Sequence, residues 1–163
     1  MSAMLGEMIG DVEILAEPQK TVITTDFTPE MIVRADAQLI RQLILNLFDN
    51  AVKYNEPGGR IVARIFSRGD NVVFNIASTG LEIPQEDRGR IFDRFHRVDR
   101  SRNRARGGQG LGLSICQEIS RAHGGDLVLV PSEPGWTTFE FSIPRIMPSQ
   151  SGIFRATAVG RSV

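Results

Sequence analysis

The feature that most constrains the fold is a hairpin in the middle of the chain. Two runs rich in β-branched and aromatic residues, 61–67 and 71–77, flank the tripeptide Arg68-Gly69-Asp70. Such a short connection containing glycine is typical of two neighbouring antiparallel strands. A doubly wound parallel sheet instead needs a long crossover between adjacent strands. The hairpin therefore favours a mixed sheet over a parallel one.

Apolar residues at helical spacing predict three main helices. The first opens the chain and would bury a stripe formed by Met4, Leu5, Met8, Ile9, Val12 and Leu15. The second is capped by Asp36, ends near Tyr54, and would bury Ile40, Leu43, Leu47 and Ala51. The third runs from Leu111 to the Gly124-Gly125 pair. A short fourth helix is expected over residues 84–95.

Runs that are rich in β-branched residues or alternate in polarity predict further strands, at residues 21–27, 31–34, 127–130 and 137–143. Together the elements predict an α+β fold. It is a two-layer α/β sandwich whose mixed, mostly antiparallel sheet carries about three helices on one face. The apolar pattern fades after Pro144, so residues 20–145 are expected to form the domain and 146–163 a flexible tail.

Composition excludes several classes of protein. The 163 residues suit one domain, and 19 basic side chains balance 19 acidic ones. No bulk charge therefore indicates nucleic acid or an anionic membrane as a partner. The single cysteine, Cys116, excludes an internal disulfide. No apolar run approaches the roughly 20 residues that span a bilayer, and the N-terminus lacks the pattern of a signal peptide.

The second helix carries a polar face beside its apolar stripe. Asn46, Asn50, Lys53 and Tyr54 lie at i, i+4, i+7 and i+8, so they share that face. Amide oxygens are suitable ligands for Mg²⁺, an ammonium can neutralise phosphate, and a phenol offers a wall for a base. The face therefore suits a magnesium nucleotide, although a solvated helix face with an incidental pair of asparagines would look the same.

A glycine-rich run precedes the third helix: Gly107-Gly108-Gln109-Gly110-Leu111-Gly112-Leu113. Backbone amides without a Cβ nearby can approach phosphate, and a helix N-terminus favours an anion. The run is neither a P-loop nor a dinucleotide fingerprint, since no Gly-Lys-Ser/Thr follows and Leu113 occupies the third glycine position. A flexible hinge is the alternative.

Between these segments lie Phe92 and Phe95, which are expected to anchor a loop, and six arginines: Arg94, Arg97, Arg100, Arg102, Arg104 and Arg106. One or two of them could reach phosphate oxygens, Arg97 before the others. Most are expected to be solvated. A nucleic-acid patch is a weaker alternative because the chain is neutral overall.

The order of the motifs is the strongest signal. Asn-x-x-x-Asn-Ala-x-Lys-Tyr is followed by Gly80-x-x-Ile83-Pro84, Phe92-Asp93-Arg94-Phe95, Gly-x-Gly-Leu-Gly-Leu, His123-Gly124-Gly125 and Thr137-Thr138-Phe139. In this order they resemble the catalytic domain of sensor histidine kinases, over residues 30–144. The resemblance implies a Bergerat-type sandwich, shared with gyrase and MutL, which binds ATP and Mg²⁺ between the second helix and a flexible lid.

The resemblance also implies roles for individual residues. Asn50 would bind Mg²⁺ with Asn46 in support, Lys53 and Arg97 would meet phosphate, and residues 93–107 would form the lid. The other implied nucleotide contacts are Tyr54, Ser78, Gly80, Ile83, Phe95, Gly108, Gly110, Leu111, Gly112, Leu113 and Thr138.

One position distinguishes a domain that transfers the γ-phosphate of ATP to a protein from one that hydrolyses ATP. Gyrase-like relatives carry a glutamate four residues before the metal-binding asparagine, and this chain has Asn46 there. A neutral amide cannot take a proton from water near neutral pH. The site is therefore expected to pass the γ-phosphate to a histidine of another domain rather than to water, which leaves an ATPase or a protein-serine kinase as a remote alternative.

Three positions depart from the family pattern. Ser78 stands where most members have an aspartate that accepts from the adenine amino group, Glu82 replaces a glycine, and Trp136 fills another glycine position. The absence of the second glycine and the stretch FDRFHRVDRSR suggest a heavy-metal-type subgroup of the sensor kinases. The same departures support an alternative reading, in which the chain is a degenerate nucleotide-binding or regulatory module with weak or no ATP binding.

The phosphoacceptor part of such a kinase is missing. The only histidines, His96 and His123, lack the acceptor motif and are expected to be structural. The chain is therefore not expected to phosphorylate itself. The resemblance implies a phosphoacceptor and dimerisation domain, entered through the helix at 1–19, and a response regulator as partners. It also implies a cytoplasmic domain without direct membrane contact, monomeric as a fragment, within a homodimeric parent in the inner membrane.

Overall fold

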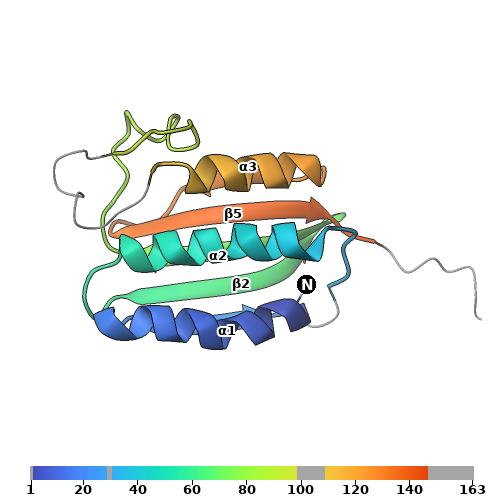
Figure 1. Ribbon diagram of the computed structural model, residues 1–163, viewed down its shortest axis with the longest axis horizontal. Coiled ribbons are helices and arrows are strands. Elements are labelled where there is room, and N and C mark those ends of the chain that lie inside the picture. The colour runs from blue at the N-terminus through green and yellow to red at the C-terminus, as the bar shows by residue number, and fades with distance from the viewer. Residues whose placement is uncertain (1, 29–30, 99–108, 147–163) are drawn as a thin grey trace, which may run out of the picture.

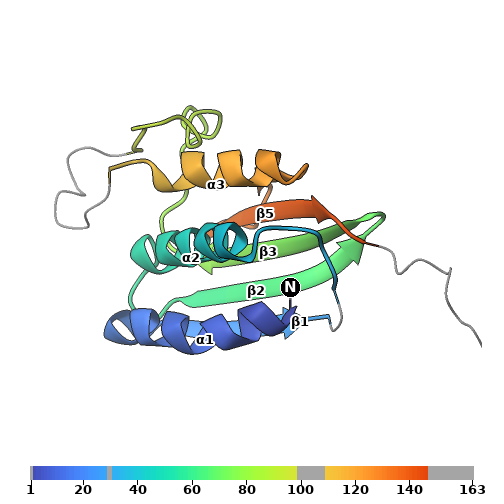
Figure 2. The ribbon, with the colours of Figure 1, turned by 45° about the vertical axis from the view of Figure 1, so that its right-hand side comes forward.

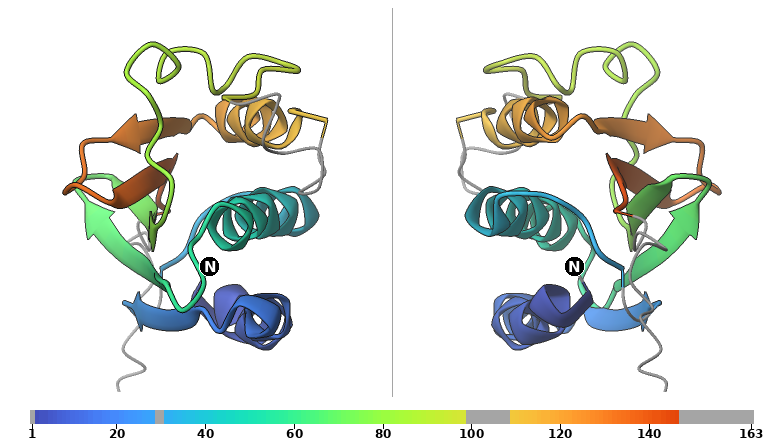
Figure 3. Two further views of the ribbon diagram at one scale, coloured as in Figure 1. Left: turned by 90° about the vertical axis from the view of Figure 1, so that its left-hand side faces the viewer. Right: turned by 90° about the vertical axis from the view of Figure 1, so that its right-hand side faces the viewer.

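The computed structural model describes residues 2–28, 31–98 and 109–146 of the chain, and the side chains from Leu5 onward. Three helices cover one face of a single sheet (Figures 1 and 3). The helices are α1 (Ser2–Ala16), α2 (Ala37–Lys53) and α3 (Gly112–Ala122). The strands are β1 (Val22–Phe27), β2 (Arg60–Arg68), β3 (Asn71–Thr79), β4 (Asp126–Val130) and β5 (Trp136–Pro144).

The sheet has the order β1-β2-β3-β5-β4. Only the β1–β2 pair is parallel, while β2–β3, β3–β5 and β4–β5 are antiparallel. The hairpin predicted around Arg68-Gly69-Asp70 joins β2 to β3, with Arg68 opposite Asn71. The prediction of a mixed, mostly antiparallel sheet with three helices on one face is confirmed.

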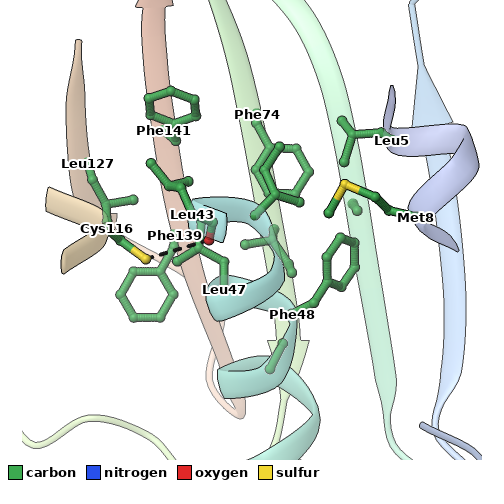
Figure 4. Packing of buried hydrophobic residues seen from close by; sticks show 14 of the residues in the cluster. Leu5, Met8, Leu43, Leu47, Phe48, Phe74, Cys116, Leu127, Phe139 and Phe141 are labelled. Carbon is green, nitrogen blue, oxygen red and sulfur yellow. Dashed lines mark hydrogen bonds between the residues drawn. The ribbon is translucent and has the colours of Figure 1, made fainter. Parts of the chain in front are cut away.

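Helix α2 is the central element of the helical layer. It begins at Asp36, whose carboxylate accepts hydrogen bonds from the backbone N–H groups of Gln38 (2.8 Å) and Leu39 (3.1 Å), as the sequence predicts for an N-cap. Its apolar stripe packs into the core, where the Phe48 ring lies 6.0 Å from that of Phe74 on β3 (Figure 4). The buried residues of α2 are Ile40, Leu43, Ile44, Leu47, Phe48, Ala51 and Val52.

Helix α1 packs into the same core beside α2 and β1 (Figure 2). Its buried stripe consists of Leu5, Met8, Val12 and Ala16. The expected burial of Leu15 is wrong: its side chain is 48% exposed. Leu15 directly precedes Ala16, so it is rotated about 100° away from the stripe. The side chain of Met4 lies outside the described part of the chain.

The strand expected at residues 31–34 is wrong. Only one residue there forms a bridge, Val33 with Arg145, and Ile146 donates its N–H to the carbonyl of Ile32 (3.0 Å). Pro144 ends β5 and has no N–H to donate. Among the described residues, this bridge is the strand pairing that the segment makes.

The helix expected over residues 84–95 is also wrong. The segment forms successive turns, in which Asp87 donates to Pro84 (3.0 Å), Arg90 to Asp87 (2.8 Å) and Asp93 to Arg90 (2.9 Å) through backbone N–H and carbonyl groups. Gly89 interrupts the segment, and its two core residues, Ile91 and Phe92, are adjacent rather than at helical spacing. No apolar stripe is available to stabilise a helix.

The chain between β3 and α3 leaves the sheet and passes beside α3 (Figures 1 and 2), and residues 99–108 of this segment lie outside the described part of the chain. The expected tail lies outside the described residues except for Ile146. Among the described residues, no helix is both long and apolar enough to cross a membrane.

Candidate nucleotide site

A cavity of about 550 Å³ lies between α2, the inner face of β3 and β5, and the start of α3. Most residues that the sequence singles out line it, although they come from four separate segments of the chain. They are Asn46, Asn50, Lys53, Tyr54, Ser78, Ile83, Arg97, Gly110, Leu111, Gly112 and Leu113. Apolar residues of the sheet and the turn segment complete the wall, namely Ile76, Ile91 and Phe139.

Three of the expected residues do not line the cavity, and a fourth lies outside the described part of the chain. Gly80 lies just behind its wall, Phe95 is 66% exposed, and Gly108 is outside the described residues. Thr138 lies opposite Ala77 in the sheet and faces away. Its neighbour Thr137, opposite Ser78, lines the cavity instead.

Strand alternation could have indicated Thr137 from the sequence. The core residues of β5 are Phe139, Phe141 and Ile143, and successive side chains of a strand point to opposite faces. Thr137 has the same parity as these residues and Thr138 does not. Asp49, Thr79 and Gln109 also line the cavity, and no sequence pattern indicated a role for them.

Lys53 lies at the C-terminal end of α2, with its ammonium 5.5 Å from the centre of the Tyr54 ring. Burial lowers the pKa of this ammonium, Asp49 opposes that effect, and the nearby charge of Arg97 lowers the pKa further. Two cations from distant segments therefore meet at one wall. Their mutual repulsion would be relieved by an anion between them.

Helix α3 packs against α2 next to the polar face of α2. Cys116 is fully buried and its thiol donates to the carbonyl of Leu43 (3.5 Å), one turn before Asn46 (Figure 4). Burial raises the pKa of the Cys116 thiol to about 12, although contact with the Asn46 amide acts in the opposite direction. The thiol is therefore neutral at physiological pH and behaves as a packing group.

The N-terminus of α3 opens onto the cavity. Its N-cap residue, Leu111, makes no side-chain cap, so the first N–H groups of the helix are not capped by that residue. The chain just before it is clamped to the preceding segment, because Phe95 donates its N–H to the carbonyl of Gly110 (2.9 Å). Phe95 has φ +65°, a left-handed conformation that is rare for an aromatic residue. A Cβ at Gly110 would lie 2.7 Å from the carbonyl oxygen of His96, so only glycine fits this contact.

A family model described as "Histidine kinase-, DNA gyrase B-, and HSP90-like ATPase" matches residues 35–146. The chain belongs to this family. The match runs from the start of α2 to the end of β5 and so contains every segment that lines the cavity. Within the family, the chain is homologous to the sensor histidine kinases.

The adaptive-response sensory kinase SasA of Nostoc sp. is 37% identical over 145 residues, which make up 88% of this chain and 35% of SasA. This chain thus spans about a third of the length of that relative. The solved structure of the mycobacterial sensor histidine kinase MprB matches with a TM-score of 0.73 and 28% identity, over 86% of this chain and 95% of that one. Full-length ShkA in complex with AMPPNP matches with a TM-score of 0.76 and 27% identity, over 88% of this chain and 30% of ShkA.

The structure shows contacts for two of the three departures, Glu82 and Trp136, in this histidine kinase-type ATPase domain. Glu82 accepts a hydrogen bond from the backbone N–H of Gly135 (2.6 Å), so its carboxylate joins the cavity wall to the β4–β5 turn. Trp136, just after that turn, stacks on Arg60, with the guanidinium carbon 5.4 Å from the centre of the indole ring. In the described part of the chain no hydrogen-bond partner for the Ser78 hydroxyl is found, and Ser78 lines the cavity.

Both histidines make structural contacts. His123 accepts a hydrogen bond from the Asp36 N–H at Nε2 (3.1 Å), while its Nδ1 lies 2.7 Å from the Ile119 carbonyl and donates to it. It thereby joins the end of α3 to the start of α2. His96 is paired through Nε2 with the carboxylate of Asp87 (2.9 Å). His96 also lines the cavity.

Proposed function

We propose that this chain is the catalytic domain of a sensor histidine kinase, which binds Mg-ATP and donates the γ-phosphate to a histidine on a separate domain. The observation that carries the proposal is the convergence of three features on one cavity. These are the amides of Asn46 and Asn50, the paired cations Lys53 and Arg97, and the N-terminus of α3. Each favours an anionic, metal-bearing ligand for a different physical reason.

The donor set fits Mg²⁺ bound to a triphosphate. Amide oxygens ligate Mg²⁺ without adding negative charge next to phosphates that already supply it. No group of three or more His, Cys, Asp or Glu side chains that could hold a metal exists among the described residues. Asn50, with Asn46 in support, would therefore share the ion with the nucleotide. When bound, the ion neutralises charge on the transferring phosphate.

The remaining lining residues would hold the nucleotide in place. Lys53, Arg97 and the backbone from Gly110 to Leu113 would bind phosphate oxygens. The resemblance adds Gly108 to this set, and that residue lies outside the described part of the chain. Tyr54 and Ile83 would flank the base, and Ser78 would accept from its amino group. At the base end we assign Thr137 rather than Thr138, because Thr137 lines the cavity.

Transfer to a histidine fits the side chains at the site better than hydrolysis. Asn46 provides no base for water, and phosphoryl transfer depends mainly on positioning and charge neutralisation. Both histidines of the chain are engaged in structural contacts. The acceptor would therefore belong to a phosphoacceptor and dimerisation domain of the same parent, which would then serve a response regulator. As the family resemblance implies, the parent would be a homodimeric inner-membrane protein with this domain in the cytoplasm.

A degenerate regulatory module is the second candidate, and Ser78 is the observation in its favour. A hydroxyl accepts a weaker hydrogen bond from adenine than a carboxylate does. Binding of the nucleotide separates the two candidates, since a degenerate site would fail to bind Mg-ATP while the fold remained intact.

The test is calorimetric titration of ATP, with and without Mg²⁺, into the intact chain and into Asn50→Ala. Mg²⁺-dependent binding that Asn50→Ala abolishes is the expected result. Asn75→Ala, the same substitution on the other face of β3, is the matched control and should bind as the wild type does. A folded wild-type chain that binds no nucleotide would refute the proposal. Phosphate appearing on a separately supplied phosphoacceptor domain, and not on this chain alone, would support the transfer step.

A further inference from the structure

A buried polar cluster lies directly behind the Tyr54 end of the cavity, where α2 ends and β2 begins. Its centre is Asn55, which is only 2% exposed and does not line the cavity. The Asn55 amide donates to the carbonyl of Arg60 (3.3 Å) and accepts from the N–H of Glu56 (2.9 Å) and the hydroxyl of Thr79 (2.8 Å). The Thr79 hydroxyl in turn accepts from the N–H of Arg60 (2.8 Å).

The backbone packs tightly against the cluster. A Cβ at Gly59 would lie 2.1 Å from Oδ1 of Asn55, and a Cβ at Gly80 would lie 2.4 Å from the carbonyl oxygen of Tyr54. Both positions are glycine, so the backbone can close directly onto Asn55 and Tyr54. Buried polar groups with their partners in place fix one arrangement, because any other would leave one of them unpaired.

The cluster joins the two walls of the cavity. Asn55 follows Tyr54, and Thr79 lies between Ser78 and the segment 80–82. Leu81 donates its N–H to the carbonyl of Tyr54 (3.3 Å), so the walls also meet directly at this point. The separation between Tyr54 on one wall and Leu81 on the other is therefore held by their backbone hydrogen bond together with the bond from Thr79 to Asn55 beside it.

We propose that Asn55 is a positioning residue for nucleotide binding, acting through Thr79 to hold Tyr54 and the segment 80–82 at a fixed separation across the cavity. The inference rests on the proposed function, because the separation matters only if a nucleotide base enters there. Because these walls are already ordered in the free protein, the ligand does not have to order them, and the free-energy cost of binding is lower.

A purely structural role would give a different result, and the chain offers a matched control for it. Glu140 on β5 is 9% exposed and pairs with Arg68 on β2, on the sheet face away from the helices. Glu140→Gln disturbs a buried polar contact of the same sheet without touching the cavity. Thr79→Ser keeps the hydroxyl of the cluster, whereas Thr79→Val removes it at almost constant volume.

The experiment measures Mg-ATP affinity by calorimetry for the wild type, Asn55→Ala, Thr79→Val, Thr79→Ser and Glu140→Gln, at a temperature where all are folded. Amide exchange of Leu81 is followed by NMR in the same proteins without nucleotide. We expect Asn55→Ala and Thr79→Val to weaken binding about five- to tenfold, the effect of one lost hydrogen bond, and to accelerate exchange at Leu81. Thr79→Ser should stay near the wild type, and Glu140→Gln should lower the melting temperature alone.

Unchanged affinity in folded Asn55→Ala, or an equal loss in Glu140→Gln, would overturn the proposal while leaving the proposed function intact. If the wild type itself bound no ATP, the proposed function would fail instead. Exchange at Leu81 would still decide about the positioning. Faster exchange in Asn55→Ala and Thr79→Val, but not in Glu140→Gln, would support it, and unchanged exchange would refute it.

Discussion

Replacing Gly80 by alanine should be far more destabilising than the addition of one methyl group suggests. Gly80 has φ +123°, a backbone conformation essentially restricted to glycine. The new Cβ would lie 2.4 Å from the carbonyl oxygen of Tyr54 and 2.9 Å from the Cα of Asn55. Both neighbours are backbone atoms that the Asn55 cluster holds in place, so they cannot turn away as a side chain would.

The expected loss of folding free energy in Gly80→Ala is the sum of two contributions. Backbone strain contributes about 1–3 kcal/mol and overpacking against fixed atoms about 1–3 kcal/mol more. The sum, about 2–6 kcal/mol, is a large part of the stability of an ordinary domain, about 5–15 kcal/mol. For a domain of this size it corresponds to a fall in melting temperature of about 5–20 °C.

Thermal and urea unfolding of Gly80→Ala should be compared with two matched glycines. Gly58 has φ +73° with nothing within 4 Å of a new Cβ, so Gly58→Ala should cost only backbone strain, about 1–2 kcal/mol. Gly10 lies inside α1 with open space around it, and Gly10→Ala should stabilise the protein by about 0.5–1 kcal/mol. Equal destabilisation by Gly80→Ala and Gly58→Ala would refute the argument from backbone contact.

Three further outcomes are expected. Ser78→Asp should tighten Mg-ATP binding about 5- to 30-fold in calorimetry, because a charged hydrogen-bond acceptor adds about 1–2 kcal/mol over a neutral one. Unchanged affinity would mean that Ser78 does not contact the base. Because burial lowers the pKa of Lys53, Mg-ATP affinity should fall as pH rises through that lowered pKa, and Lys53→Arg should remove the fall; identical pH profiles would exclude Lys53 as the titrating group. Cys116, with its pKa raised to about 12 and no exposed surface, should resist thiol reagents until the protein unfolds, and rapid labelling of the native chain would contradict its burial.

The sequence predicted the sheet because its strongest signals are local. The Arg68-Gly69-Asp70 turn, the Asp36 cap and the alternation of Phe139, Phe141 and Ile143 each depend on neighbours in the chain, and all three features occur as predicted. The two wrong elements lacked such a signal. Residues 31–34 have β-branched residues but form a single bridge within the described part of the chain, and residues 84–95 have apolar residues without helical spacing.

The candidate site was predictable where function depends on residue type at fixed spacing. The α2 face and the glycines before α3 were found in this way, and the structure brings them together at one cavity. Contacts that depend on the pairing of distant strands were not accessible. The interaction of Glu82 with Gly135, and that of Asn55 with Thr79, join residues 53 and 24 positions apart, and neither pair carries a sequence pattern.

The two ends of the cavity are consequently built in different ways. At the Tyr54 end, side-chain hydrogen bonds from Asn55 and Glu82 fix the walls to the sheet. At the α3 end, the backbone hydrogen bond between Phe95 and Gly110 and the side-chain pair of Arg94 with Glu118 join the turn segment to α3. Phe95 has a left-handed conformation there that costs about 1–3 kcal/mol. A base needs a pocket of constant shape, whereas a phosphate that is to be transferred must be both enclosed and released. In the proposed function, the base would lie at the end that side chains fix to the sheet, and the transferred phosphate at the end where the backbone is strained.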